Sequence, residues 1–188
     1  MNLIFFGIQG SGKGTQAKLL AESHNYTIFE TGGRLRELSK EDSDLGRKVK
    51  ETIDAGHLVS AELVIEILKD FIANHKDQQI IFDGIPRSLE QQAMFQEALN
   101  EFNLDAVAVH FVVAEDVVMQ RLLKRAEIEG RADDNEEAIA RRIGIFKSET
   151  FPILDIYKNQ NKYIEVDATP EIDQVRENLL QGLQNYGN

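Results

Sequence analysis

Short apolar runs alternate along this chain with longer segments in which apolar residues recur every three or four positions. The runs have the length and composition of buried strands, and they cover residues 2–6, 26–29, 79–82, 106–113 and 162–166. The longer segments predict helices over residues 16–22, 61–73, 88–99, 116–125 and 134–157 and from Glu171 onward. Strands that alternate with helices in this way predict an α/β fold with a parallel sheet of about five strands.

Local signals refine the limits of these helices. Ser60 is a good N-cap for the helix that follows it, and residues 134–137 have the form of a capping box. Pro152 is expected to bend the helix over 134–157 or to split it in two.

Two segments interrupt the regular alternation. The polar region after the second strand is expected to be helical with breaks at Gly46 and Gly56. Residues 126–133 are expected to form a short polar loop. Repeats and linkers are absent from the sequence, so the 188 residues are expected to form one domain with small inserts.

Composition limits the class of protein. Apolar residues make up 42% of the chain, which is enough for a substantial core. The chain has no cysteine, which excludes disulfides and thiolate zinc sites and fits a reducing compartment. It shows no basic leader and no apolar stretch of membrane-spanning length, so a soluble, cytoplasmic protein is expected.

Positive charge is scarce and unevenly distributed. The formal net charge of −11 argues against a general nucleic-acid surface. Half of the arginines nevertheless fall within one short stretch, and these are Arg121, Arg125, Arg131, Arg141 and Arg142. Any site for an anionic ligand must therefore be a local one.

A glycine-rich stretch, Gly7-Ile8-Gln9-Gly10-Ser11-Gly12-Lys13-Gly14-Thr15, lies between the first strand and the first helix. This context distinguishes a phosphate-binding loop from an ordinary glycine-rich turn. Bare backbone N–H groups, the positive end of the helix and Lys13 would all face a phosphate. Gly14 stands where Ser or Thr usually holds Mg²⁺, and the hydroxyl comes one residue later at Thr15. A Mg²⁺ ion is therefore expected to be held mostly by nucleotide oxygens and water.

The loops after the first three strands are expected to meet at one edge of the sheet, where ligands of such folds bind. They are the glycine-rich loop and residues 31–36 and 83–87. Asp83 ends the third strand and is expected to orient Mg²⁺ or its water ligands. Arg87 can grip a phosphate with two hydrogen bonds. The simpler alternatives are a carboxylate that caps a turn and a surface arginine.

Arg121 and Arg125 are four residues apart, so they share a helix face, while Arg131 and Arg142 flank the polar loop and the next helix. Taken alone, this pattern fits equally well a charged helix whose arginines pair with acidic neighbours, namely Glu127, Glu129, Asp133 and Asp134. Beside a phosphate loop it favours anion binding, because transfer of a phosphoryl group between two nucleotides gathers several negative charges.

The histidines suggest no further chemistry. They are scattered as His24, His57, His75 and His110, and neither a Ser-His-Asp set nor a histidine metal cluster is indicated. His110 lies inside an apolar run and is expected to be a core residue.

Together these motifs resemble those of the nucleoside monophosphate kinases, and most closely the adenylate kinase family. The motifs are the glycine-rich loop, Thr31-Gly32-x-x-Leu35-Arg36, Asp83-Gly84-x-Pro86-Arg87, Arg121-x-x-x-Arg125, and Arg131-x-Asp133-Asp134-x-Glu136-Glu137 leading to Arg142. The match is collinear from Leu3 to about Thr169. It implies a P-loop NTPase fold with three α/β/α layers, a five-stranded parallel sheet and two mobile inserts. The implied core is 1–29, 60–125 and 133–188, with a nucleoside-monophosphate arm over 30–59 and a short lid over 126–132.

The resemblance also implies an activity: reversible, Mg²⁺-dependent, direct in-line transfer of the γ-phosphoryl group of ATP to AMP, which gives two ADP and balances the adenine nucleotide pool. Its implied partners are ATP, AMP and ADP, without nucleic acid or membrane, and its implied state is a monomer. No structural zinc is expected, since the long zinc-binding lid of some members is absent.

Residue roles follow from the same resemblance. ATP would lie on Gly10, Ser11, Gly12, Lys13, Gly14 and Thr15, with Arg121 stacked on its adenine, Arg125 on its phosphates and the backbone near Pro170 beside the adenine. AMP would contact Thr31 and Arg36, the backbone of His57, Leu58 and Val59, the phosphate-holding group Gly84, Ile85, Pro86 and Arg87, and Gln91, which would read the adenine edge. Catalysis would depend on Lys13, Arg87, Arg125, Arg131 and Arg142, with Asp83 acting on Mg²⁺ through water.

Three positions depart from the family pattern. Gly33 replaces an aspartate thought to organise the water molecules of Mg²⁺, so metal affinity or rate is open to change. Ile85 replaces the usual Phe before Pro86, and His57 replaces a more typical lysine or arginine.

Other functions fit the sequence less well. A UMP or CMP kinase would share the fold, although Thr31 and Gln91 favour adenine. A GTPase switch would need Asn-Lys-x-Asp, and the nearest string, at 161–164, lacks the aspartate. A non-catalytic nucleotide-binding module that has lost activity is suggested by Gly33, but all of the expected arginines remain.

Overall fold

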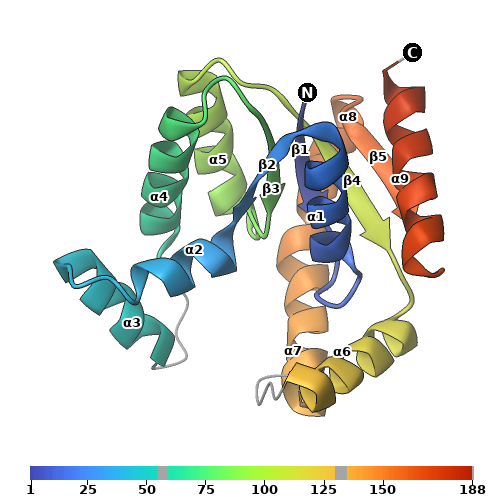
Figure 1. Ribbon diagram of the computed structural model, residues 1–188, viewed down its shortest axis with the longest axis horizontal. Helices are drawn as coiled ribbons and strands as arrows, with labels where there is room; N and C mark the ends of the chain where they lie inside the picture. The colour runs from blue at the N-terminus through green and yellow to red at the C-terminus, as the bar shows by residue number, and fades with distance from the viewer. Residues whose placement is uncertain (55–58, 130–134, 188) are drawn as a thin grey trace.

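Figure 1 shows the computed structural model of the chain, which describes residues 1–54, 59–129 and 135–187. These residues contain one five-stranded sheet in the order β2-β3-β1-β4-β5, and every neighbouring pair of strands is parallel. The strands are β1 (Asn2–Phe6), β2 (Tyr26–Glu30), β3 (Gln79–Asp83), β4 (Ala106–Val112) and β5 (Tyr163–Asp167). The predicted α/β fold with its parallel sheet is confirmed.

Helices cover both faces of the sheet and form a three-layer structure (Figure 1). One face packs against α4 (Ala61–Asn74), α5 (Leu89–Glu101) and α8 (Phe151–Asn159), and the other against α1 (Lys13–His24) and α9 (Ile172–Tyr186). The central strand β1 is buried throughout, and its side chains alternate between the two cores: Ile4 and Phe6 in the first, Leu3 and Phe5 in the second. The C-terminal end of β1 is thereby fixed in the middle of the molecule.

Side-chain caps fix the starts of several helices. The Ser60 hydroxyl accepts the N–H of Leu63 at the start of α4, and the Ser88 hydroxyl accepts that of Gln91 at the start of α5. At the start of α7 (Glu136–Ile145), Asn135 accepts the N–H of Ala138. The predicted capping box at 134–137 is therefore wrong by one residue, because the Asn135 side chain forms the cap.

The long helix predicted over 134–157 is split, as expected near Pro152. It consists of α7, a five-residue π-helical segment (Phe146–Thr150) and α8, in whose first turn Pro152 lies. The missing N–H of a proline is tolerated in the first turn of a helix, which explains why the new helix begins here.

The region after β2 differs from its prediction. It consists of α2 (Thr31–Leu38) and α3 (Asp44–Asp54), so residues 31–36 are helical rather than a loop and the break falls before Gly46. Gly46 lies inside α3, where a Cβ would come within 2.4 Å of the Glu41 carbonyl oxygen and 2.6 Å of the Leu38 carbonyl oxygen. Glycine serves here for close packing between the two helices rather than as a break. Gly56 lies outside the described residues.

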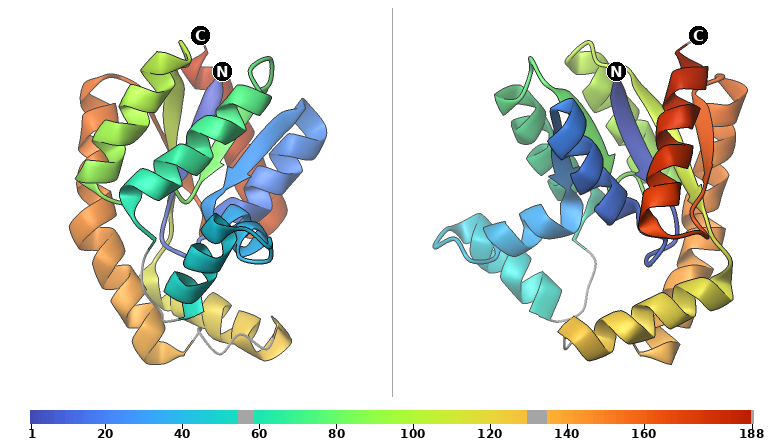
Figure 2. Two further views of the ribbon diagram at one scale, coloured as in Figure 1. Left: turned by 90° about the vertical axis from the view of Figure 1, so that its left-hand side faces the viewer. Right: turned by 45° about the vertical axis from the view of Figure 1, so that its right-hand side comes forward.

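The helix predicted over 116–125 is also longer than expected. It is α6 (Glu115–Glu129), so the prediction of a loop is wrong for residues 126–129, while 130–133 lie outside the described residues. Figure 2 shows that α2 and α3 on one side, and α6 and α7 on the other, extend beyond the C-terminal edge of the sheet. The boundaries of the two inserts, 30–59 and 126–132, remain predictions.

His110 is confirmed as a core residue of β4 and is 7% exposed. Its Nδ1 lies 2.9 Å from the Tyr163 hydroxyl, which donates to Glu165 Oε2 at 2.7 Å. Since that hydroxyl gives its own proton to Glu165, we assign the proton between the two rings to His110 Nδ1. In the part of the chain that the structure describes, no helix is both long and apolar enough to cross a bilayer.

Candidate active site

The glycine-rich loop joins the buried end of β1 to the start of α1. Gly12 is the N-cap of α1 with φ of 89°, a backbone conformation that favours glycine. It makes no side-chain capping bond, and a Cβ placed on it would meet nothing within 4 Å. The first turn of α1 therefore presents its backbone to open space, as a site for phosphate requires.

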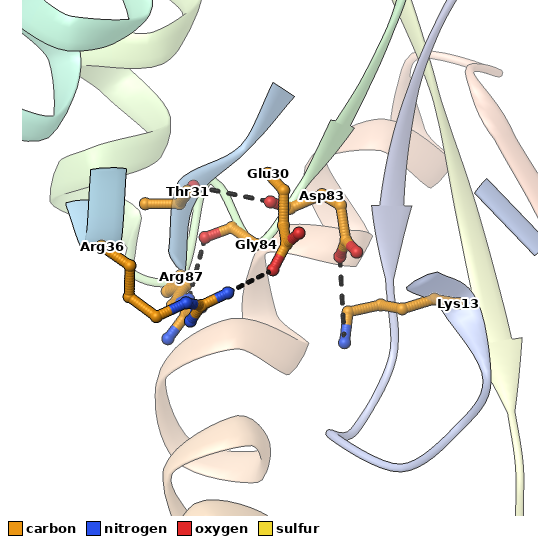
Figure 3. A network of polar contacts seen from close by, with 7 residues as sticks. All are labelled: Lys13, Glu30, Thr31, Arg36, Asp83, Gly84 and Arg87. Atoms are coloured by element: carbon orange, nitrogen blue, oxygen red, sulfur yellow. Dashed lines mark hydrogen bonds and ion pairs between the residues drawn. The ribbon is translucent and has the colours of Figure 1, made fainter. Parts of the chain in front are cut away.

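Lys13 and Asp83 form the centre of the site. Lys13 begins α1, Asp83 ends β3, and Lys13 Nζ lies 3.9 Å from Asp83 Oδ1 (Figure 3). Burial lowers the pKa of Lys13, while Asp83 acts against that effect. Burial also raises the pKa of Asp83, with Lys13 opposing and the like charge of Glu30 adding to the rise. The attraction between Lys13 and Asp83 therefore does not fully offset the cost of burying their charges. A cation near Asp83 would stabilise the carboxylate, and a phosphate near Lys13 would stabilise the ammonium group.

The space beside Asp83 is suited to a hydrated cation. A Cβ placed on Gly14 would lie 3.5 Å from Asp83 Oδ2, so the side chain that other phosphate loops carry here is replaced by open space next to a carboxylate. Such a space fits Mg²⁺ held through water, which it releases reluctantly. Thr15, the next hydroxyl along the chain, is exposed. Among the described residues, no three His, Cys, Asp or Glu side chains gather closely enough to hold a metal ion.

The loop after β3 holds Arg87 in place. Its Nε donates to the Gly84 carbonyl at 2.8 Å, and its backbone N–H donates to Gln91 Oε1 at 2.9 Å. Gly84 has φ of 87°, which favours glycine, while Ile85 and Pro86 after it are buried. The loop is therefore fixed from both sides, and Gln91 is tied to it.

Thr150 contacts the loop that carries Arg87, and the sequence did not indicate it as a site residue. Its hydroxyl donates to the Arg87 carbonyl at 2.8 Å from the π-helical segment, 63 residues away in sequence. Only the tertiary fold brings the two together, so no local signal reveals the contact. A π-helical turn inside a helix commonly marks a functional region.

The end of β2 adds a third set of groups. Glu30 ends the strand beside Asp83 in the register, and its Oε1 accepts from Arg36 Nη2 at 3.1 Å. Thr31 Oγ1 lies 3.5 Å from the Asp83 carbonyl oxygen, at the limit of a hydrogen bond. Figure 3 shows the side chains of Glu30 and Asp83 extending in the same direction from the ends of their strands. The sequence pointed to Thr31 and Arg36 but missed Glu30.

The arginines of α6 and α7 approach the same centre. Burial lowers the pKa of Lys13 and of Arg87, and the like charges of Arg125 near Lys13 and of Arg142 near Arg87 add to this effect. Arg121 binds the loop after β5, where its guanidinium donates to the carbonyls of Ala168, Thr169 and Pro170 at 2.9, 3.0 and 3.2 Å. The two groups predicted beside the ATP adenine, Arg121 and Pro170, are therefore in direct contact.

Not every predicted residue can be placed. Val59 is partly buried against the core cluster of α4 and α5. Arg131, His57 and Leu58 lie outside the described residues, as do Asp133 and Asp134. The predicted residues that lie near one another are Lys13, Asp83, Arg87, Arg125 and Arg142, a predominantly cationic set beside the carboxylates of Asp83 and Glu30.

Known proteins resemble the chain over nearly all of its length. A sequence profile of the family described as adenylate kinase matches residues 5–162. The chain is 37% identical over 185 residues to an adenylate kinase of Bacteroides thetaiotaomicron, which covers 97% of this chain and 98% of the relative. It is 36% identical over 188 residues to an adenylate kinase of Flavobacterium johnsoniae, with coverage of 98% and 99%. Adenylate kinase 1 of Schistosoma mansoni is 35% identical over 187 residues, with coverage of 98% and 93%.

Proposed function

The chain belongs to the adenylate kinase family, and we propose that its site transfers the γ-phosphoryl group of ATP reversibly to AMP, giving two ADP. Its class of activity, that of a phosphotransferase, follows from the family. The observation that carries the proposal is the meeting of Lys13, Asp83 and Arg87 at the ends of β1 and β3, where two phosphate-binding loops face one another.

The donor nucleotide would bind along the first loop. The N–H groups of residues 10–15 and the Lys13 ammonium would hold the ATP phosphates, with Arg125 beside Lys13 adding charge. The adenine would lie against Arg121, whose three hydrogen bonds to the 168–170 backbone hold the guanidinium against this loop. An arginine fixed in this way can stack on a base without losing further side-chain entropy.

The acceptor would bind between β2 and β3. Arg36 and Arg87 would hold the AMP phosphate, and Thr31 and Gln91 would face the nucleoside. Arg36 is paired with Glu30 through half-exposed side chains, so exchanging this partner for a phosphate costs little. Arg142, near Arg87, would neutralise the group in transit, and we assign the same role to Arg131.

The reaction would be direct and in line. Phosphoryl transfer requires little covalent chemistry from a protein, and rate comes from positioning and from charge that is already in place. Bound with ATP, Mg²⁺ supplies positive charge to the phosphate oxygens. Asp83 would orient the water ligands of this ion, and the space left by Gly14 would admit them. Lys13, Arg87 and Arg142 would hold the two nucleotides end to end, so no enzyme-bound phosphoryl intermediate is needed.

Water must be kept from the reacting phosphoryl group, or ATP would be hydrolysed. We propose that the arm over 30–59 and the lid over 126–132 close on the nucleotides. Lid closure of this kind occurs in adenylate kinases. The described parts of the two segments, α2 and α3 of the arm and the end of α6, lie beyond the C-terminal edge of the sheet (Figure 2). We further propose a cytoplasmic monomer that acts on ATP, AMP and ADP and not on nucleic acid; its net charge of −11 supports the last point.

Comparing acceptors tests this proposal. We would measure the rate of ADP formation with Mg²⁺-ATP and, separately, AMP, CMP, UMP and GMP. We expect AMP to be by far the best acceptor. If CMP or UMP reacted as fast as AMP or faster, the proposed phosphoryl transfer would still hold. The acceptor that we assign from Thr31 and Gln91 would be wrong.

A further inference from the structure

Glu30 is a charged residue at the centre of the site to which the proposed function gives no role. It is the last residue of β2 and the N-cap of α2, yet its side chain makes no capping hydrogen bond. The residues that usually cap a helix from this position are Ser, Thr, Asp and Asn, and glutamate is not one of them. The Glu30 carboxylate instead accepts from Arg36 and extends in the same direction as Asp83 (Figure 3). The local structure of α2 therefore does not account for it.

The Glu30 side chain lies tightly against the position that a side chain at Gly33 would take. A Cβ placed on Gly33 would be 3.1 Å from Glu30 Oε2 and 3.4 Å from its Cδ. The backbone does not require glycine there, since Gly33 lies within α2 and is not among the glycines with positive φ. The absence of a side chain at Gly33 therefore allows the Glu30 carboxylate to lie where it does.

Stability does not explain why the carboxylate is there. The side chains of Glu30 and Arg36 are 51% and 57% exposed, and ion pairs of this kind contribute about 0–1 kcal/mol. The neighbour of Glu30 across the strands is Asp83, another carboxylate, and the like charge raises the pKa of Asp83. Two carboxylates at the ends of adjacent strands repel each other unless a cation lies near them.

We propose that Glu30 is a positioning residue that takes the place of the carboxylate missing at Gly33, and that with Asp83 it orders the water molecules around nucleotide-bound Mg²⁺. The inference rests on the proposed function, since the cation arrives with ATP. Before AMP binds, Arg36 holds the Glu30 side chain in this direction. It follows that a carboxylate at position 33 would lie against that of Glu30 and be repelled by its charge, so the site favours a carboxylate at one of the two positions.

Four proteins test this proposal: the parent chain, E30Q, G33D and the double variant E30Q/G33D. E37Q is the matched control, since Glu37 lies on the same helix and pairs with Arg34, away from the site. Binding of Mn²⁺ as a Mg²⁺ probe would be titrated by electron paramagnetic resonance with saturating ATP and no AMP. Melting temperatures and rates of AMP phosphorylation would be measured on the same samples.

The single variants should be impaired and the double variant should recover. We expect E30Q to raise the Mn²⁺ dissociation constant about 10- to 100-fold, the usual effect of removing an outer-shell partner, without changing the melting temperature. G33D alone should bind Mn²⁺ no better than the parent and melt at a lower temperature, because its carboxylate is repelled by that of Glu30. E30Q/G33D should restore Mn²⁺ binding and rate, and E37Q should match the parent.

Two outcomes would overturn the proposal: E30Q that binds Mn²⁺ as the parent does, or changes at positions 30 and 33 whose effects simply add. A gain of Mn²⁺ affinity and rate in G33D alone would also overturn it, since the site would then hold both carboxylates. Failure of the proposed function is a separate result. If the parent failed to phosphorylate AMP, the Mn²⁺ titrations with ATP would still decide the role of Glu30.

Discussion

Three hydrogen bonds fix Arg87: its guanidinium bonds the Gly84 carbonyl, its N–H bonds Gln91, and its carbonyl accepts from Thr150. None of them occupies the outer edge of the guanidinium, which is the part that grips a phosphate. The side chain is therefore oriented before the nucleotide arrives, so less entropy is lost on binding.

Replacing Arg87 tests this role. Arg87→Ala should lower the rate of phosphoryl transfer by about 10²-fold or more, the effect of losing a charge that stabilises the transition state. The melting temperature should change little, because the exposed side chain contributes little to the core. Arg141→Ala is the matched control, since Arg141 is exposed and paired with Glu137. A cooperative melt with near-normal rate in Arg87→Ala would contradict the role.

Asp83 is expected to act through the cation. Asp83→Asn keeps the shape of the side chain but removes the charge beside the space at Gly14. It should therefore raise the Mg²⁺ concentration needed for half-maximal rate and lower the maximal rate. Asp70→Asn, on the exposed face of α4, should leave both unchanged. A Mg²⁺ titration of Asp83→Asn that superimposes on the parent curve would exclude the metal role.

The sequence indicated those site residues whose chemistry is written in a local motif. Lys13, Asp83 and Arg87 are examples, since each belongs to a motif at the C-terminal end of a strand. Glu30 and Thr150 were missed because their roles depend on partners that the fold supplies: the empty space at Gly33 for one, the Arg87 carbonyl for the other. Arg131 was predicted from its motif and remains a prediction.

At the scale of elements, the π-helical segment between α7 and α8 connects the arginine-bearing helix α7 to the loop of Arg87. Thr150 makes the connection through a buried hydroxyl. Thr150→Val has nearly the same shape but leaves the Arg87 carbonyl without this donor. The loop should then lose both stability and orientation.

We expect Thr150→Val to lower the free energy of unfolding by about 1–3 kcal/mol, the cost of an unsatisfied buried polar group. The rate of phosphoryl transfer should fall by up to about 10²-fold, as a small displacement of a catalytic group can cause. Thermal melts and steady-state rates would show both effects. Ser148→Ala removes an exposed hydroxyl from the same segment and serves as control. Equal behaviour of the two variants would show that Thr150 does not position Arg87.

The pairing of β4 with β5 gives the fold a pH dependence through His110. Burial lowers the pKa of His110 to about 4, although Glu165 opposes the effect. In the unfolded chain His110 takes up a proton near its ordinary pKa of 6.5, whereas in the folded protein it does so only near pH 4. The free energy of unfolding is therefore at its full value above pH 6.5 and decreases as the pH falls toward 4. Between pH 7.5 and pH 5 the loss should be about 2 kcal/mol.

Urea unfolding at several pH values measures this loss. His110→Gln should be less stable than the parent at pH 7.5 but should lose less stability on acidification. His24→Gln, which changes an exposed histidine, should follow the parent curve. If His110→Gln and the parent lost the same free energy between the two pH values, the buried histidine would not be the cause.

The start of α4 could be predicted because Ser60 acts within one turn of its own position, while the start of α7 was predicted one residue before its cap, Asn135. The extension of α6 to Glu129 and the place of Gly46 inside α3 could not, because packing against other segments decides both. The position of Gly46 is set by the carbonyls of Leu38 and Glu41, which belong to the preceding helix and connection.

For the whole molecule, the alternation of strands and helices was enough to predict a parallel sheet and the edge at which the site lies. The order of the strands places β1 and β3 side by side, so that Lys13 and Asp83 face each other across the site. This adjacency comes from the tertiary structure.

One measurement tests the central claim most directly, the transfer of a phosphoryl group from ATP to AMP without release to water. It is a ³¹P NMR time course of the protein with Mg²⁺ and ATP, recorded with and without AMP. We predict that ADP resonances appear only when AMP is present, that two ADP form for each ATP consumed, and that no inorganic phosphate accumulates. Inorganic phosphate released from ATP, or ATP that stays intact beside AMP, would contradict the account.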